Sequence, residues 1–243
     1  MKSRIQHFLQ RVLGLKNYLR LFSWYKIKTL KSDKGENDFF HFIDLIPSDK
    51  LALDIGANIG IMSYYLCKRT RPNNVYAFEP IPSNISALHW IKKRFGLDNM
   101  QIVEAALGNA NGSIEMVLPV VDKVKKQGLS HVVTEEITEF NEGIRFTAES
   151  IRLDDFTPLI DQEIGAIKID VENFEYQVFL GATELLRKHH PMIYCELWDN
   201  QNRYNCFDLL RSLGYTVKVK EGNSLVNFDE KNHTTQNFFF VYE

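Results

Sequence analysis

Short apolar runs alternate with amphipathic segments along most of the chain. Five runs have the length and apolar content of buried strands: 51–55, 75–80, 101–104, 165–169 and 191–196. Between them, apolar residues recur three or four positions apart, as they do on the buried face of a helix. Alternating strands and helices predict an α/β fold with a mostly parallel, doubly wound sheet of the Rossmann-like kind.

The pattern changes near the end of the sequence. A last amphipathic helix ends at Gly214, and a strand at 215–219, a turn at Gly222 and a strand at 237–242 follow it. Two strands with a glycine turn between them predict that the sheet ends in an antiparallel hairpin.

The alternation also lapses at 111–156. Strands are expected at 112–118 and 144–153, and the polar connector between them carries Lys123, Lys125, Lys126, Ser130 and His131. Long connectors inside compact domains usually have a function or move, so we interpret 111–156 as an insertion on the substrate side. His131 is a candidate base or substrate contact; the alternative is a histidine that is simply exposed.

The N-terminal segment is amphipathic and basic. Apolar residues recur at helical spacing on both sides of Gly14, and residues 1–35 hold nine Lys or Arg against one acid, Asp33. One interpretation is a helix pair packed on the main domain; the other is a surface for an anionic membrane, an acidic partner or an acidic substrate.

Packing is the commoner use of a terminal helix. We therefore expect residues 1–46 to form a helical extension and residues 47–243 to form the main domain. On this interpretation, deletion of residues 1–35 lowers stability, and the intact protein binds anionic vesicles only weakly.

Composition narrows the class of protein without identifying it. A chain of 243 residues that is 44% apolar suits one domain with a sizeable core. Three cysteines, Cys67, Cys195 and Cys206, have no metal-ligand spacing and make no even disulfide set, so we expect a reducing, cytoplasmic setting. No apolar run approaches the roughly 18 residues of a membrane-spanning helix. The main domain is acidic, which argues against nucleic acid as a partner.

The sequence LDIGANIG at 53–60 connects the first strand to a helix that we expect to begin near Asn58. Glycines at 56 and 60 are expected to let a ligand lie directly on the backbone. Asp54 is placed where an acid accepts a hydrogen bond from a ligand hydroxyl or ammonium.

Glu79 ends the second strand, in VYAFEP. A carboxylate at this position suits the two ribose hydroxyls of an adenosine. The turn at 56–60 lacks the middle glycine of the G-x-G-x-x-G sequence that binds a pyrophosphate, because Asn58 stands there. A ligand with ribose and adenine but no diphosphate fits better, and S-adenosylmethionine (SAM) is the common one.

Taken in order, LDIGANIG, VYAFEP, IVEAALGN at 102–109, IKIDVENFE at 167–175 and PMIYCEL at 191–197 resemble the FkbM family of SAM-dependent methyltransferases. The resemblance implies a class I methyltransferase fold and favours O-methylation of a sugar, a glycan or a secondary metabolite. The family usually has glycine after D-V-E, where this chain has Asn173. Because asparagine tolerates left-handed backbone, we expect the turn to be kept.

The candidate site residues lie at the carboxyl ends of the predicted strands. We expect cofactor contacts from Asp54, Gly56, Ala57, Asn58, Gly60, Glu79, Pro80, Glu104, Ala105 and Asp170. Glu104 and Ala105 are placed to face the adenine. When the methyl acceptor is a hydroxyl, a positioned base increases the rate by about 100-fold. The candidate bases are Asp170, Glu172, Glu196 and His131. Alternatively, Asp170 orders the methionine end of the cofactor and Glu172 caps the next helix.

Two other classes of function remain open. A nicotinamide-dependent oxidoreductase uses a similar sheet, and a catalytically inactive methyltransferase fold serves as a binding module. No residue spacing calls for a metal ion, although carboxylates are ligands that divalent ions accept. The sequence leaves the methyl acceptor and the oligomeric state open.

Overall fold

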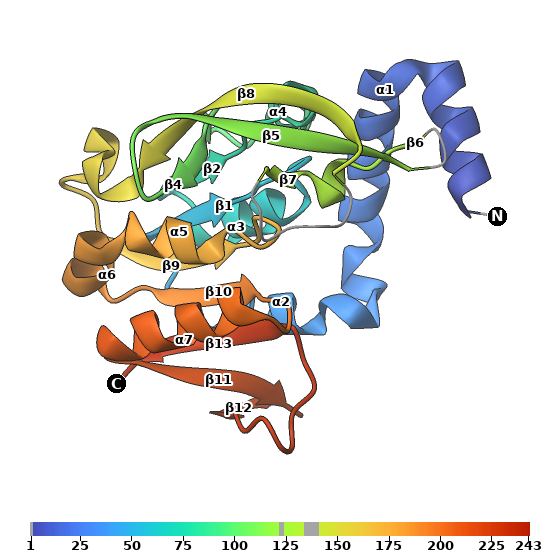
Figure 1. Cartoon of the computed structure of the whole chain (residues 1–243). Helices are drawn as coiled ribbons and strands as arrows, with labels where there is room; N and C mark the ends of the chain where they lie inside the picture. The colour runs from blue at the N-terminus through green and yellow to red at the C-terminus, as the bar shows by residue number, and fades with distance from the viewer. Residues whose placement is uncertain (1, 122–123, 134–140) are drawn as a thin grey trace.

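The computed structural model describes residues 2–121, 124–133 and 141–243, and Figure 1 shows their arrangement. Eight strands of this described chain form the main sheet, in the order β12-β11-β13-β10-β9-β1-β2-β3. The parallel strands are β1 (Leu51–Ile55), β2 (Val75–Phe78), β3 (Met100–Val103), β9 (Ile164–Ile169) and β10 (Met192–Glu196). The predicted mostly parallel, doubly wound sheet is confirmed, with β9 beside β1 as expected.

The far end of the sheet is antiparallel, as predicted, but it contains one more strand. Its members are β11 (Tyr215–Glu221), β12 (Ser224–Asn227) and β13 (Asn237–Tyr242). The turn at Gly222 leads into β12, and β13 lies between β10 and β11 and pairs with both. β12 escaped prediction because an edge strand of four residues with two apolar side chains is too short a pattern.

Helices cover both faces of the main sheet (Figure 1). They are α2 (Asn37–Leu45), α3 (Ile61–Thr70), α4 (Pro82–Phe95), α5 (Glu175–Leu180), α6 (Thr183–His189) and α7 (Gln201–Ser212). Successive side chains of a strand point to opposite faces. Leu53 therefore packs in one core with Phe179 of α5, whereas Ala52 packs in a second core with Leu66 of α3.

Two helix boundaries differ from the prediction. α3 begins at Ile61 rather than near 58, because Asn58 and Gly60 have left-handed backbone, with φ of 50° and 82°. The helical segment after β9 is split into α5 and α6 at Gly181. A Cβ there would meet the carbonyl oxygen of Gly108 at 2.0 Å, so the chain breaks where it packs on a neighbouring strand.

The segment at 111–156 contributes to a second, smaller sheet. Its strands are β4 (Ala106–Gly108), β5 (Gly112–Val121), β6 (Val124–Lys125), β7 (His131–Val132) and β8 (Gly143–Arg152). The strand expected at 112–118 is confirmed as part of β5, and the one expected at 144–153 is confirmed as β8 except at Leu153, which begins a 3-10 helix. The connector contains β6 and β7, each paired with β5, while Lys123 lies outside the described residues. Short 3-10 helices complete the chain at Leu30–Ser32, Lys34–Glu36, Gln127–Leu129, Leu153–Asp155 and Thr157–Leu159.

Helix α1 (Lys2–Thr29) changes direction at Gly14, whose φ of 69° and ψ of 154° are not helical. Its second half packs on the main domain: Tyr18 and Leu19 are buried beside Ile59, and the Ser23 hydroxyl donates to the Ile59 carbonyl oxygen at 3.0 Å. None of the described helices, α1 included, has the length and apolar content to cross a membrane.

The first half of α1 reaches the small sheet instead. The Gln10 side-chain amide donates to the Lys125 carbonyl oxygen and accepts from the Lys125 backbone nitrogen, both at 3.3 Å. The Lys126 ammonium donates to Gln6 Oε1 at 3.0 Å. These bonds join segments more than 110 residues apart in the sequence.

We expect Leu19→Ala to lower the free energy of unfolding by about 2–5 kcal/mol, because Leu19 is 2% exposed and its loss leaves a cavity under α1. Leu21→Ala, on the same helix but 51% exposed, should change it by less than about 0.5 kcal/mol. Urea denaturation of the two variants measures the difference. Equal costs would mean that α1 does not pack on the domain in solution.

Candidate functional site

The glycine turn after β1 is shaped by the protein's own packing. Gly56 and Gly60 have φ of 74° and 82°. A Cβ on Gly56 would lie 1.8 Å from the Asp170 carbonyl oxygen, and a Cβ on Gly60 would lie 2.9 Å from Leu88 Cδ2. The packing of the protein itself therefore requires both glycines, and the expectation that they also let a ligand lie on the backbone stays a prediction.

Glu79, at the end of β2, is buried and holds the glycine turn in place. Its Oε2 accepts from the Asn58 backbone nitrogen at 2.7 Å, and its Oε1 accepts from the Ile81 nitrogen and from the Asn84 side chain. Burial raises the pKa of Glu79 to about 7, although these three donors favour the charged form. Each carboxylate oxygen has two acceptor sites, so Oε2 can take another donor.

Three cavities open at the carboxyl ends of the parallel strands. The first has walls from β1, β2, the small sheet and the turn after β9; the second lies between α1, β6 and the glycine turn; the third lies between the Lys34–Glu36 helix and the ends of β9 and β10. Asp170 lines all three cavities, and Gly56 and Asn58 line both the first and the second. The ends of the parallel strands thus place the Asp170 carboxylate where the three cavities adjoin.

The first cavity is apolar on most of its wall and carries polar atoms with no partner. Phe78, Leu107 and Met116 are among its lining residues. The Asn84 Oδ1 and Ser130 Oγ atoms, also in its wall, are buried and have no hydrogen-bond partner among the described residues. Buried polar atoms of this kind usually meet a ligand or an ordered water.

Lys168 is a buried cation that the sequence analysis missed. Its ammonium donates to the Gly56 carbonyl oxygen at 2.9 Å and lies 3.4 Å from Asp54 Oδ1 and 3.8 Å from Asp170 Oδ2. Burial opposes the charge, but Asp54 and then Asp170 outweigh it and raise the pKa of Lys168. The signal was present in the sequence: a lysine inside the apolar run IGAIKI is rarely buried without a partner.

Asp54 lies beneath the cavities rather than in their walls. It is fully buried, and its Oδ2 accepts from the Ser63 hydroxyl at 2.5 Å. Asp54 contacts Ser63 and Lys168, and its expected bond to a ligand stays a prediction. Asp54 thus positions Lys168, which in turn lies against Asp170.

Two further carboxylates flank Asp170. Glu172 lines the first cavity, and burial together with the charge of Asp170 raises its pKa to about 9. Glu196 lines the third cavity, and the same two causes raise its pKa to about 7. At neutral pH Glu172 is therefore protonated, whereas Glu196 is close to its midpoint, where a general base works best.

The turn after Asp170 keeps the shape that the family glycine would give. Asn173 has φ of 73°, which confirms the expected left-handed backbone, and its Oδ1 accepts from Asn200 at 2.7 Å. Glu175 Oε1, not Glu172, accepts from the backbone nitrogens of Val171 and Asn173, both at 3.2 Å.

The other predicted site residues divide into two groups. Ala105 and Pro80 line the first cavity, and Ala57 lines the second. Glu104 is exposed, lies 3.3 Å from His89 and lines none of the three cavities. Its predicted contact with adenine remains a prediction.

His131 is buried, and the alternative that it is simply exposed is wrong. It is 3% exposed; its Nδ1 lies 2.9 Å from the Leu129 carbonyl oxygen and its Nε2 lies 3.1 Å from Asn141 Oδ1. His131 lines none of the three cavities, although its neighbour Ser130 lines the first. The strand β7 turns this histidine into the insertion's interior.

We expect Lys168→Met to lower the free energy of unfolding by about 3–5 kcal/mol, because it leaves Asp54 buried beside no cation. The double variant Asp54→Asn with Lys168→Met should lose less free energy of unfolding than the single variant, since it also removes the negative charge of Asp54. Lys220→Met, which breaks a partly exposed contact with Asp38, is the control and should cost less than about 1 kcal/mol. Chemical denaturation that gives the double variant the larger loss would contradict this account.

Relatives with assigned names match most of the chain. Methyltransferase 1 of Beauveria bassiana is 25% identical over 215 residues, which cover 77% of this chain and 84% of that protein. Methyltransferase sdnD of Sordaria araneosa is 25% identical over 174 residues, 70% of this chain and 61% of that protein. The AMB antimetabolite synthetase AmbE of Pseudomonas aeruginosa is 24% identical over 222 residues, but the chain spans only 10% of its length.

Solved structures share the fold. The methyltransferase FkbM from Methylobacillus flagellatus superposes with a TM-score of 0.53 at 15% identity, covering 80% of this chain and 44% of that chain. A Streptococcus mutans protein in complex with SAH superposes with a TM-score of 0.50 at 9% identity, covering 86% of this chain and 96% of that chain. At these identities the likeness concerns the fold alone, which is Rossmann-like.

The family model described as the methyltransferase FkbM domain matches residues 54–217. The matched region contains the glycine turn, Glu79, Asp170 and Glu196, and it extends over more than half of the chain. The chain therefore belongs to the FkbM methyltransferase domain family.

Proposed function

We propose that this protein transfers a methyl group from SAM to a hydroxyl of a sugar, a glycan or a secondary metabolite. Membership of the FkbM family supports methyl transfer, and two relatives are named as methyltransferases. The observation that carries the proposal is the position of Asp170, where the first cavity meets the second and the third. A methyl donor bound in one cavity and a methyl acceptor bound in another would meet at the Asp170 carboxylate.

The residues of the first cavity fit the nucleoside end of SAM. Glu79 Oε2 can accept from a ribose hydroxyl, and Asn84 Oδ1 and Ser130 Oγ offer further bonds that the protein leaves unmade. The apolar wall suits a purine ring. Gly56 and Asn58, shared with the second cavity, would hold the amino-acid end beside Asp170.

The same wall argues against the nicotinamide alternative. A dinucleotide brings a diphosphate with negative charge, which the carboxylates of Asp170 and Glu79 in the wall of the first cavity would repel. SAM brings a sulfonium and an ammonium group, which negative charge attracts. The inactive-module alternative is weakened because the perturbed acids cluster where a reacting group would lie.

When bound, SAM supplies an electrophilic methyl group with a neutral leaving group, so alignment provides much of the rate. Asp170 accepts the proton of the acceptor hydroxyl. Lys168 holds Asp170 from below at 3.8 Å, and Glu196 on the adjacent strand raises the local negative charge once it ionises.

The extension and the insertion have a place in this proposal. Tyr18 and Phe22 of α1, with Lys125 and Lys126 of the insertion, line the second cavity. We therefore assign residues 47–243 to the catalytic domain, 111–156 to a substrate-side insertion and 1–46 to an extension that helps to enclose the acceptor. Three buried free cysteines suit the reducing cytoplasm, where we place the protein.

We expect S-adenosylhomocysteine to raise the melting temperature and NAD to leave it unchanged. Saturation at 100 times the dissociation constant adds about 2.7 kcal/mol of stability. Glu79→Ala should weaken binding by roughly 1.5–3 kcal/mol, the range for a hydrogen bond to a charged group. Glu104→Ala, whose carboxylate lines none of the three cavities, is the matched control.

Isothermal titration of both variants, with ligand-free melting curves as the check on folding, decides this point. Tight binding of NAD would refute the cofactor assignment. Equal weakening by Glu104→Ala would instead place Glu104 in the cofactor site, as the sequence suggested.

Turnover should fall about 100-fold or more in Asp170→Asn, because the amide keeps the size of the side chain but cannot take a proton. Affinity for S-adenosylhomocysteine should stay nearly unchanged.

The variant Glu196→Gln is the comparison, and its turnover at high pH should stay within about tenfold of that of the unchanged protein. A screen of hydroxyl compounds with labelled SAM supplies the assay. Loss of cofactor affinity in Asp170→Asn would assign Asp170 to the cofactor and leave Glu196 or Glu172 as the base.

Activity should rise with pH through about 7, because Glu196 is neutral below that pH and ionised above it. The ionised Glu196 adds negative charge beside Asp170, which favours transfer of the proton away from the acceptor hydroxyl. In Glu196→Gln this inflection should disappear, and the pH dependence of kcat should then reflect the other ionisable groups of the site. A pH–rate profile of kcat that keeps its inflection near 7 in the variant would show that Glu196 does not control it.

A further inference from the structure

The outer face of α1 exposes an unusual amount of apolar surface. Half of the exposed large apolar side chains in the described ranges lie on this one helix: Ile5, Phe8, Val12, Leu21, Trp24 and Tyr25. Phe8 and Val12 are 63% and 62% exposed. Single exposed apolar residues are ordinary, but a concentration on one element marks an interaction surface.

Helical spacing gathers these residues into two stripes. Ile5, Phe8 and Val12 are three and four positions apart before the kink at Gly14, and after it Trp24 and Tyr25 follow Leu21 by three and four positions. The face opposite to the second stripe is the one that buries Leu19 against the domain. Packing and an outward apolar face therefore coexist on one helix, whereas the sequence presented them as alternatives.

The apolar surface continues beyond α1. A shallow groove is lined by Leu21 and Trp24 of α1 and by Trp90 of α4, with Arg20 and Arg94 beside them. Tryptophan and arginine together are typical of the boundary between water and lipid, because each combines an apolar body with a polar group.

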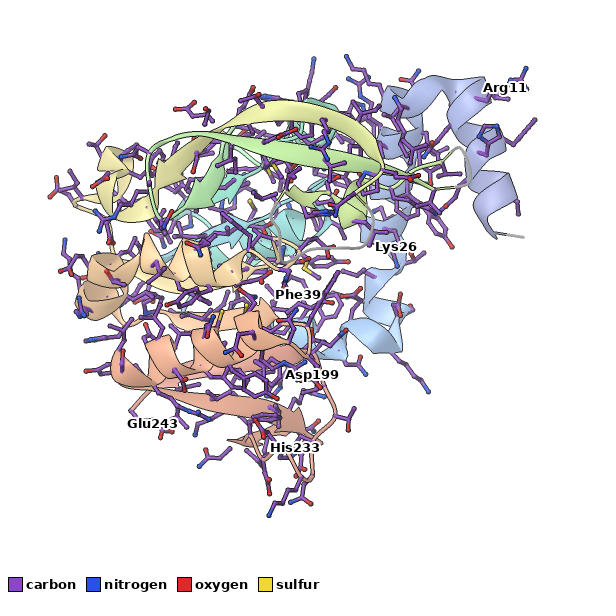
Figure 2. All side chains as sticks on the ribbon, in the orientation of Figure 1. Arg11, Lys26, Phe39, Asp199, His233 and Glu243 are labelled. Carbon is purple, nitrogen blue, oxygen red and sulfur yellow. The ribbon has the colours of Figure 1, made fainter. Side chains whose placement is uncertain are left out.

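Most basic residues of α1 and of the turn after it are left without acidic partners among the described residues. In the described part of the chain Lys26 pairs with Asp33, but Arg11, Lys16, Lys28, Lys31 and Lys34 form no ion pair. Figure 2 shows Arg11 at the top of the first half of α1, close to the kink and away from the main sheet. This surplus of positive charge is available to an anionic surface.

We propose that the outer face of α1, together with Trp90 and Arg94, is a docking surface for an anionic lipid bilayer. The exposed stripes would enter the headgroup boundary, and the unpaired cations would lie against lipid phosphates. A second copy of the chain fits less well, because a two-fold interface on this face would bring the same basic residues against each other. This surface is independent of the methyl-transfer proposal.

Co-sedimentation of the full-length chain with lipid vesicles tests the surface. We expect pelleting with vesicles that contain phosphatidylglycerol and not with pure phosphatidylcholine, and a marked decrease at physiological salt, since exposed charges are screened. Phe8→Ser with Val12→Ser should reduce the bound fraction at least about tenfold, because two exposed apolar groups are lost. Val120→Ser with Ile144→Ser, two exposed apolar residues of the small sheet, is the matched control and should bind as the unchanged protein does.

A charge variant separates electrostatic from apolar attraction. Arg11→Gln with Lys16→Gln and Lys31→Gln should remove most of the salt-sensitive pelleting, and Lys231→Gln, an exposed lysine near the other end of the sequence, should not. Because all these side chains point to solvent, the melting temperatures should stay the same. Absence of pelleting, or equal pelleting with neutral vesicles, would overturn the proposal. So would a dimer in analytical ultracentrifugation that Phe8→Ser with Val12→Ser dissolves.

Discussion

A lysine buried between two aspartates is the constraint on which the candidate site depends. Lys168 is 3% exposed, and its ammonium lies against Asp54, Asp170 and the Gly56 carbonyl oxygen. Moving such a charge out of water is expensive, and only close partners of opposite sign make it tolerable. One cation thereby fixes the end of β1, the end of β9 and the turn between β1 and α3 relative to one another.

The backbone around this cluster is equally determined. The Asp170 carbonyl oxygen occupies the space that a Cβ on Gly56 would need, so the two turns approach as closely as atoms allow. Glu79 holds one turn through the Asn58 nitrogen, and Glu175 holds the other through the nitrogens of Val171 and Asn173. Buried carboxylates that accept from backbone nitrogens thus set the geometry on both sides of Asp170.

The sequence predicted those features that recur along the chain or at strand ends. The apolar runs located the five parallel strands, and Glu79, Asp170 and Glu196 follow from their carboxyl ends. Contacts between distant segments were not predictable: the hydrogen bonds of Gln10 with Lys125, or the burial of His131, depend on how the small sheet folds back. The packing reason for Gly56 was also hidden, because Asp170, whose carbonyl oxygen it approaches, lies more than 100 residues away in the sequence.

The second cavity has one side whose residues tolerate no substitution, which is the rigid side, and one side whose residues can be substituted, which is the exchangeable side. Gly56 and Lys168 belong to the rigid side, where any larger or uncharged side chain collides or leaves a carboxylate without its partner. Phe22 of α1, which is only partly buried, belongs to the exchangeable side. Under the proposed function, laboratory evolution of acceptor preference therefore has room on α1, where a changed side chain reshapes the second cavity and leaves the residues at the strand ends unchanged.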